Sequence, residues 1–263
     1  MFVLLFSIAR SALAQTPAPS EFELGKAAMD AHDPTAAIRH FERAEGKASR
    51  SWIAVALMME SRSPGDEYVQ RAFDAAAQSR ANRPERLRSR SDLAAALHPG
   101  DAIVTFLIGE QHAYAWALDR DTLIGYPLPR PDGIATAVER VKGYVAQNDR
   151  EGVQRIADDL VPALLGPLFE RVPSLTRVTF VMDGPLRTLP ILELLSTDTA
   201  PGIERLAVSI ADDESLFDEI QRPPTPRESP RREWPRLALL VGAAAIAIAA
   251  ISLLARRRSR ARS

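Results

Sequence analysis

The chain has 263 residues, of which 46% are hydrophobic and 25% charged, so it can bury a sizeable core. This composition excludes collagen-like and disulfide-stapled proteins, and the absence of cysteine excludes thiolate metal sites and cysteine nucleophiles. Residues 222–263 carry ten arginines and two glutamates, and residues 1–20 carry only Arg10. Since the net charge is −1, residues 21–221 hold −10, and this acidic body with a basic tail points toward a membrane and away from nucleic acid.

The first residues have the pattern of a secretory signal. An apolar run from Phe2 to Ile8 is followed by Ala12 and Ala14, small residues with the spacing of a signal-peptidase site. This pattern predicts export and a signal peptide over residues 1–14. The alternative is an amphipathic N-terminal helix that stays buried in the fold.

Residues 21–91 have helical periodicity, with breaks at Asp33-Pro34 and Pro64-Gly65. In the first hairpin, small residues fall where two helices would touch, and one aromatic ring fills the gap between them: Gly25, Ala28, Ala37, Phe41 and Ala44. The last three positions recur 32 residues later as Val69, Phe73 and Ala76. This pattern resembles tetratricopeptide repeats. Two units are too few for a stable solenoid, so we expect them to pack on the next domain or on a partner. The alternative is a helical hairpin without a binding role.

After residue 98 the periodicity changes, and strands alternate with helices. Strands are expected at 102–108, 113–118, 122–128, 177–182 and 206–210. Helices are expected at 134–147 and at 153–169, the second interrupted at Pro162 and broken at Gly166-Pro167, while 189–195 is a helix or a short strand. The alternation predicts an α/β domain over residues 92–221.

Several short motifs in this domain are those of one family. They are Gly109-Glu110 with Tyr114, Ala115 and Trp116; Leu165-Gly166-Pro167-Leu168; Asp183-Gly184-Pro185-Leu186 with Leu189-Pro190; and the run from Arg205 to Ser209. Over residues 92–215 the chain resembles the CHAT domain, a caspase-like fold that often follows tetratricopeptide repeats. The resemblance implies a partial caspase-like α/β sandwich.

The resemblance does not carry catalysis with it. In active relatives, a histidine and a cysteine well downstream of the Asp-Gly-Pro-Leu turn cleave peptides. This chain has no cysteine, and its histidines all lie upstream of that turn: His32, His40, His98 and His112. We therefore expect a truncated, catalytically inactive domain with no catalytic residue, no cofactor and no metal site. The alternative is a cryptic hydrolase of the exported compartment that uses another nucleophile.

Few other polar residues suit chemistry. Asp212, Asp213 and Glu214 follow a predicted strand and are ligands of the type that hard cations prefer, although a solvated turn is the simpler interpretation. Asp183 ends another strand at the edge where α/β sites form, and its simpler role is to accept N–H groups of the following turn. Ser209 and Ser215 have no histidine nearby in sequence, so they lack the base of a serine hydrolase.

The residues after 221 predict a stalk, a membrane span and a tail. Five prolines within 222–235 favour extended polyproline geometry. The nineteen uncharged residues from Leu237 to Ala255 would span roughly 28 Å, so we expect a transmembrane helix over 236–255. Five arginines follow in 256–263, and such clusters stay cytoplasmic. A single-pass protein is predicted, with its body periplasmic or extracellular.

These patterns lead to one functional hypothesis, a membrane-anchored, exported protein-interaction module. A partial sandwich leaves an apolar edge or face of its sheet uncovered. A protein partner, or self-association of the chain, would cover that surface. No nucleic-acid partner is expected.

Overall fold

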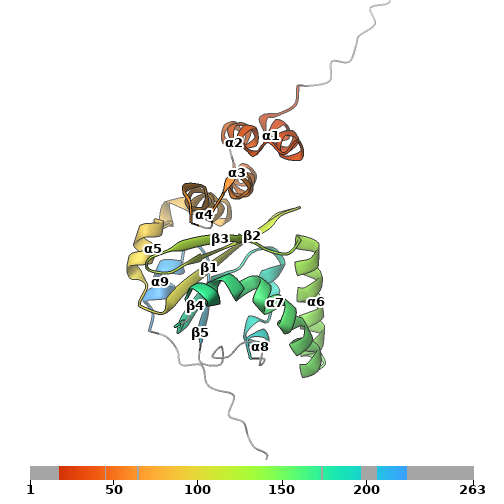
Figure 1. Ribbon diagram of the computed structural model, residues 1–263, viewed down its shortest axis with the longest axis vertical. Helices are drawn as coiled ribbons and strands as arrows, with labels where there is room; N and C mark the ends of the chain where they lie inside the picture. The colour runs from red at the N-terminus through yellow and green to blue at the C-terminus, as the bar shows by residue number, and fades with distance from the viewer. Residues whose placement is uncertain (1–17, 45, 64, 173, 197–205, 224–263) are drawn as a thin grey trace, which may run out of the picture. The chain divides into compact units, whose positions relative to one another are not determined.

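The computed structural model describes residues 18–44, 46–63, 65–172, 174–196 and 206–223 (Figure 1). The predicted signal peptide, the membrane span, the basic tail and the stalk beyond Pro223 lie outside these residues. Among the residues that are described, no helix is both long enough and apolar enough to cross a bilayer.

The first part of the chain is helical, as its periodicity predicts. The helices are α1 (Glu21–Asp30), α2 (Pro34–Arg43), α3 (Lys47–Glu60), α4 (Glu67–Arg80), the 3₁₀ turn η1 (Pro84–Arg86) and α5 (Arg90–Ala96). The expected break at Asp33-Pro34 is present, because Asp33 caps α2 by accepting the N–H of Ala36 at 2.9 Å and Pro34 occupies the first turn. The expected contact of the first hairpin is present too, since a Cβ at Gly25 would lie 2.5 Å from the Phe41 ring.

A five-stranded sheet follows, in the order β3-β2-β1-β4-β5. Its strands are β1 (Asp101–Ile108), β2 (Ala113–Leu118), β3 (Leu123–Pro127), β4 (Arg177–Val181) and β5 (Ala207–Ala211), all predicted to within a residue or two. β1, β2 and β3 form an antiparallel meander, whereas β4 runs parallel to β1 and β5 parallel to β4. The α/β class is therefore confirmed.

The helices of this domain are α6 (Pro131–Ala146), α7 (Arg150–Arg171), η2 (Gly184–Thr188), α8 (Ile191–Leu194) and α9 (Leu216–Gln221). The predicted break at Gly166-Pro167 is wrong, because α7 continues through both Pro162 and Pro167. Pro162 is exposed and Pro167 half-buried, so the helix carbonyls they leave without an N–H partner lie toward water. The inner side of α7 is buried along its length, and this packing keeps the helix continuous. Helix α9 was not predicted.

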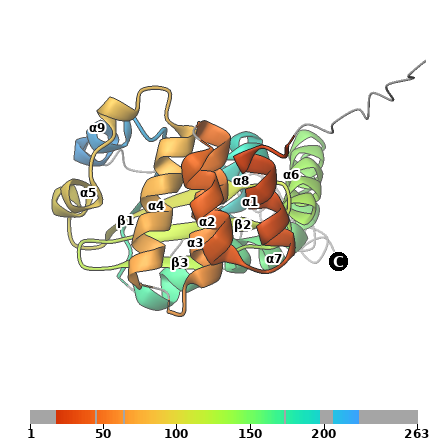
Figure 2. The same ribbon diagram turned by 90° about the horizontal axis from the view of Figure 1, so that it is seen from above.

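Both faces of the sheet are covered (Figures 1 and 2). On one face, α6, α7, η2 and α8 pack against the sheet in a single apolar cluster. On the other, α3 contacts β2 and α4 contacts β3, while α5 and α9 lie side by side at one end. The helices before the sheet share this second core with it, so the prediction that they pack on the following domain is confirmed.

Candidate interaction site

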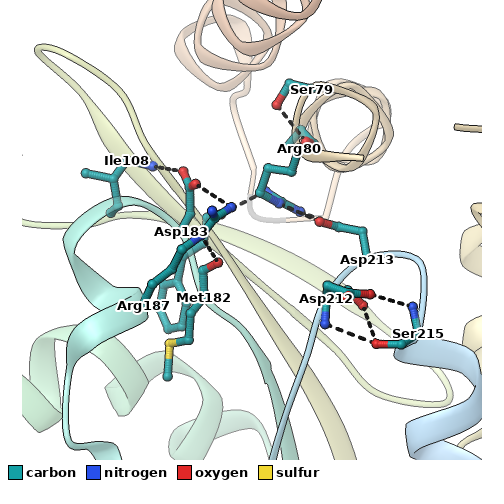
Figure 3. Close-up of polar contacts among 11 residues, drawn as sticks. Ser79, Arg80, Ile108, Met182, Asp183, Arg187, Asp212, Asp213 and Ser215 are labelled. Carbon is teal, nitrogen blue, oxygen red and sulfur yellow. Dashed lines mark hydrogen bonds and ion pairs between the residues drawn. The ribbon is translucent and has the colours of Figure 1, made fainter. Parts of the chain in front are cut away.

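The parallel strands β1, β4 and β5 have their carboxyl ends at the same end of the sheet (Figure 3). Several polar residues that the sequence analysis singled out lie there, among them Asp183 and Asp213. Asp183 follows β4, and its carboxylate accepts the backbone N–H of Ile108 at 2.9 Å. The Arg187 guanidinium lies 3.8 Å from its other oxygen. The expected role of Asp183 inside the following turn is therefore wrong, because its hydrogen bond reaches across to the end of β1.

In the acidic turn after β5, Asp212 is exposed to solvent, whereas the Asp213 side chain is buried against an arginine. Asp213 binds the Arg80 guanidinium through both oxygens, at 2.7 and 2.8 Å, and the two side chains are only 7% and 5% exposed. Glu214 accepts the backbone N–H groups of Asn82 and Arg83, both at 2.7 Å. Each carboxylate thus has protein partners, and the described residues contain no group of metal-ligating side chains.

Asp212 has a local role in the same turn. Its carboxylate accepts the N–H of Ser215 at 2.7 Å, and hydrogen bonds from the Ser215 side chain and backbone lower the pKa of Asp212. Asp212 is therefore ionised at neutral pH and holds the entry to α9. Ser215 is committed to this turn and does not stand beside a base.

Arg80 also lies at this end of the sheet, and the sequence analysis gave it no role. It lies in the last turn of α4, and besides Asp213 it donates to the Phe106 carbonyl of β1 at 2.7 Å. One buried guanidinium thus joins α4, β1 and the turn after β5. No local pattern could reveal this, because Arg80 and Asp213 are 133 positions apart.

The opposite end of the sheet carries a second buried ion pair. Arg177 of β4 binds Asp101 of β1, and these side chains are 7% and 8% exposed. The same guanidinium donates to the carbonyls of Ile220 at 2.6 Å and Arg222 at 2.8 Å. Carbonyls at the end of a helix lack intrahelical partners, and here Arg177 supplies one. The chain is therefore fixed to the sheet where the predicted stalk begins.

The four histidines do not assemble a hydrolase. His40 contacts Glu21 at 2.7 Å and His98 lies 3.5 Å from Asp101. His32 bonds a backbone carbonyl, and the His112 ring stacks beside Tyr114. Within the described part of the chain, no histidine hydrogen-bonds a serine or threonine, so the hydroxyl–imidazole pair of a serine hydrolase is not formed there.

Ser209, the other candidate hydroxyl, is engaged elsewhere. Its Oγ lies 2.9 Å from the Thr179 Oγ1 on the neighbouring strand β4. The hydrogen-bond partners of Ser209 and Ser215 are therefore Thr179 and Asp212 rather than a histidine.

Two open grooves mark the surface. A groove of about 630 Å³ on α2, α3 and α4 carries charges of both signs, including an Arg71–Glu42 pair at 3.6 Å. A second, of about 520 Å³, lies between α6 and α7. Among the described residues, neither is lined by an unpartnered buried polar side chain. Neither groove therefore shows which ligand it would select.

The described sheet has two outer strands, β3 and β5. β3 is buried in its first four residues and ends at Pro127, whereas β5 is only partly buried along its length. In the part of the chain that the structure describes, no strand pairs with the outer edge of β5. The Ala207 N–H donates to the Thr176 carbonyl at 2.9 Å, so odd-numbered residues of β5 bond to β4. By strand alternation, the N–H and C=O groups of Val208 and Ile210 point outward. Ile210 is also 56% exposed, more than any other large hydrophobic side chain described.

Comparison with protein-family models, curated proteins and solved structures found no match to this chain. The site must therefore be interpreted from its own geometry. Both faces of the sheet are closed by helices, so the edges of β3 and β5 remain. Of these two edges, β5 carries the exposed Ile210 and no proline, whereas β3 ends at Pro127.

Proposed function

We propose that this chain is an exported, membrane-anchored interaction module that binds another protein through the open edge of β5. Its helices would be tetratricopeptide-like and its sheet domain a catalytically inactive CHAT-like sandwich. The observation that carries the proposal is the unpaired row of backbone groups at Val208 and Ile210, beside an exposed isoleucine. An open strand edge is a template for strand addition by a second chain.

The edge lacks the features that normally protect edge strands. Natural edges are blocked by charged side chains, prolines or bulges. The five residues of β5 include no charge and no proline, and all five pair in register with β4. A strand that is regular, uncharged and open is therefore suited to binding rather than to remaining solvated.

The anchor and topology rest on the sequence. A signal peptide over 1–14, a stalk over 222–235, a span over 236–255 and a tail over 256–263 would place the body outside the cytoplasm. The clamp of Arg177 on Ile220 and Arg222 suits this arrangement, because it ties the body to the start of the stalk.

The hydrolase alternative gains no support from the site. The chain contains no cysteine, and the hydrogen bonds of Ser209 and Ser215 go to Thr179 and Asp212. The purified full chain should therefore not hydrolyse a mixed peptide library. Peptide cleavage that co-purifies with the chain and is lost in a Ser209→Ala variant would contradict this.

Site-specific photocrosslinking in cells tests the proposed surface. A benzophenone amino acid replaces Ile210 in the full chain, and a matched control replaces Tyr68, a 39% exposed side chain on α4. We expect a discrete protein adduct from position 210, well above that from position 68. Equal labelling at the two positions would contradict a binding site at the β5 edge.

A further inference from the structure

We infer that the occupant of this edge is a second copy of the chain, whose β5 pairs antiparallel with the first around a two-fold axis through Ser209. The inference rests on the proposed function and names its partner. Two five-stranded sheets would then join into one continuous sheet. The outward backbone groups of β5 are symmetric about Ser209, which suits pairing of two identical strands.

The outward backbone groups are arranged symmetrically about Ser209. Val208 precedes it, Ile210 follows it, and both point their N–H and C=O away from β4. If Ser209 lies opposite Ser209 of the second copy, then Val208 lies opposite Ile210 in both directions. Each such pair exchanges both of its backbone hydrogen bonds, so every outward group of the two residues is satisfied.

The side chains agree with the same register. Val208 and Ile210 pair with Val178 and Phe180 of β4, so both lie on the face covered by α6, α7 and α8. In the dimer, Ile210 would lie directly beside Val208 of the second copy on that face. Cross-strand pairs of β-branched residues stabilise sheets. The pairing therefore covers the large hydrophobic side chain that is most exposed among the described residues.

The opposite face of β5 does not obstruct the approach. Ala207 and Ala211 are small, and the Ser209 hydroxyl already bonds to Thr179. If the two strands slid by one residue, Val208 would lie opposite Ser209 of the second copy. The N–H and C=O groups of Ser209 already bond to β4, so Val208 would have no partner. The alternation thus selects the register centred on Ser209 over its one-residue shifts.

A second copy fits this edge because its Val208 and Ile210 would lie on one face beside Ile210 and Val208 of the first copy. It is also the partner that the predicted anchor would supply, since copies confined to one membrane meet at high effective concentration. The acidic body, with −10 over residues 21–221, opposes pairing by repulsion. The dimer should therefore become stronger as salt is raised and this repulsion is screened.

Cysteine crosslinking tests the register directly, because the natural chain contains no cysteine. In a non-hydrogen-bonded antiparallel pair, opposite Cα atoms lie about 4.5 Å apart, within the range of roughly 4.4–6.8 Å that a disulfide spans. We expect Ser209→Cys, in the membrane-embedded full chain under mild oxidation, to form a covalent dimer on the order of tenfold faster than Tyr68→Cys. Ile210→Cys should crosslink slowly, because the two introduced sulfurs would be diagonal neighbours. Faster crosslinking from position 210 than from position 209 would overturn this register.

A second variant, at Ile210, tests the pairing even if Ser209→Cys fails to fold. Ile210→Pro removes an N–H that faces away from β4, so the single chain keeps its own sheet while the dimer loses a bond. The full chain in mild detergent should change from dimer to monomer by light scattering, whereas Tyr68→Lys should remain dimeric. If the natural chain is monomeric and position 210 photocrosslinks to a different protein, the second copy is excluded and the proposed function stands. If position 210 crosslinks to nothing, both fail.

Discussion

The two faces of the sheet bury different kinds of side chain. Toward α6, α7 and α8, the strands β1 and β4 present only apolar residues: Ala102, Val104, Phe106, Val178 and Phe180. Toward the other helices, the same strands bury polar and charged ones among the apolar: Asp101, Thr105, Arg177 and Thr179. Apolar burial is non-directional and stabilises the fold, whereas buried ion pairs specify which segments meet. The mixed face is therefore where α4 and α9 are held in position.

The apolar face should carry the largest loss of stability. Phe180 is fully buried and its ring stacks on Phe106 with centroids 6.2 Å apart. Phe180→Ala should lower the free energy of unfolding by about 3–5 kcal/mol, because it removes buried area and leaves a cavity. Urea unfolding of the full chain in detergent measures this loss. The exposed Ile210→Ala should cost under about 0.5 kcal/mol in the same assay under monomeric conditions. Similar losses for both variants would remove the distinction between core and edge.

On the mixed face, the Arg80–Asp213 ion pair can be tested with two variants. One variant breaks the pair, and the other replaces both residues with apolar ones. Arg80→Met leaves the Asp213 carboxylate buried without its counter-ion, so it should cost about 3 kcal/mol. The double variant Arg80→Met with Asp213→Leu should recover most of this loss, because no unpaired charge then remains buried. Both follow from the same urea midpoints. A double variant no more stable than the single one would show that the pair itself stabilises the fold.

A smaller effect is expected at Thr105. Its hydroxyl is buried opposite Trp116, and neither the Thr105 Oγ1 nor the Trp116 Nε1 has a hydrogen-bond partner among the described residues. Thr105→Val removes an unsatisfied polar atom, so stability should stay level or rise by up to about 1 kcal/mol. Thr179→Val is the matched control and should cost about 1 kcal/mol, since it breaks the bond to Ser209. A loss at Thr105 equal to that at Thr179 would mean that its hydroxyl is bonded.

Local patterns were sufficient for the strands and for most of the helices, although α9 was not predicted. Uninterrupted apolar runs marked β1, β2 and β4, and the Asp33-Pro34 pair marked the start of α2. Gly25 and Phe41 were predicted to touch because their spacing put a small residue opposite an aromatic one.

The predictions that failed concern features that are set by contacts between segments distant in the sequence. Pro162 and Pro167 predicted breaks in α7, yet the buried inner side of that helix outweighs their local preference. Asp213 was expected to be solvated because its partner Arg80 lies on α4, far away in the sequence. Arg177 gave no signal for the same reason, since it reaches both Asp101 and the end of α9.

Amide hydrogen exchange along β5 tests the central claim most directly. In the full chain reconstituted with lipid, the account predicts that the outward N–H groups of Val208 and Ile210 are protected as well as those of Ser209 and Ala211, because a bound strand covers them. Lowering the ratio of protein to lipid should release the first two and leave the second two protected. Fast exchange of Val208 and Ile210 under every condition, beside slow exchange of Ser209 and Ala211, would show that the edge binds nothing.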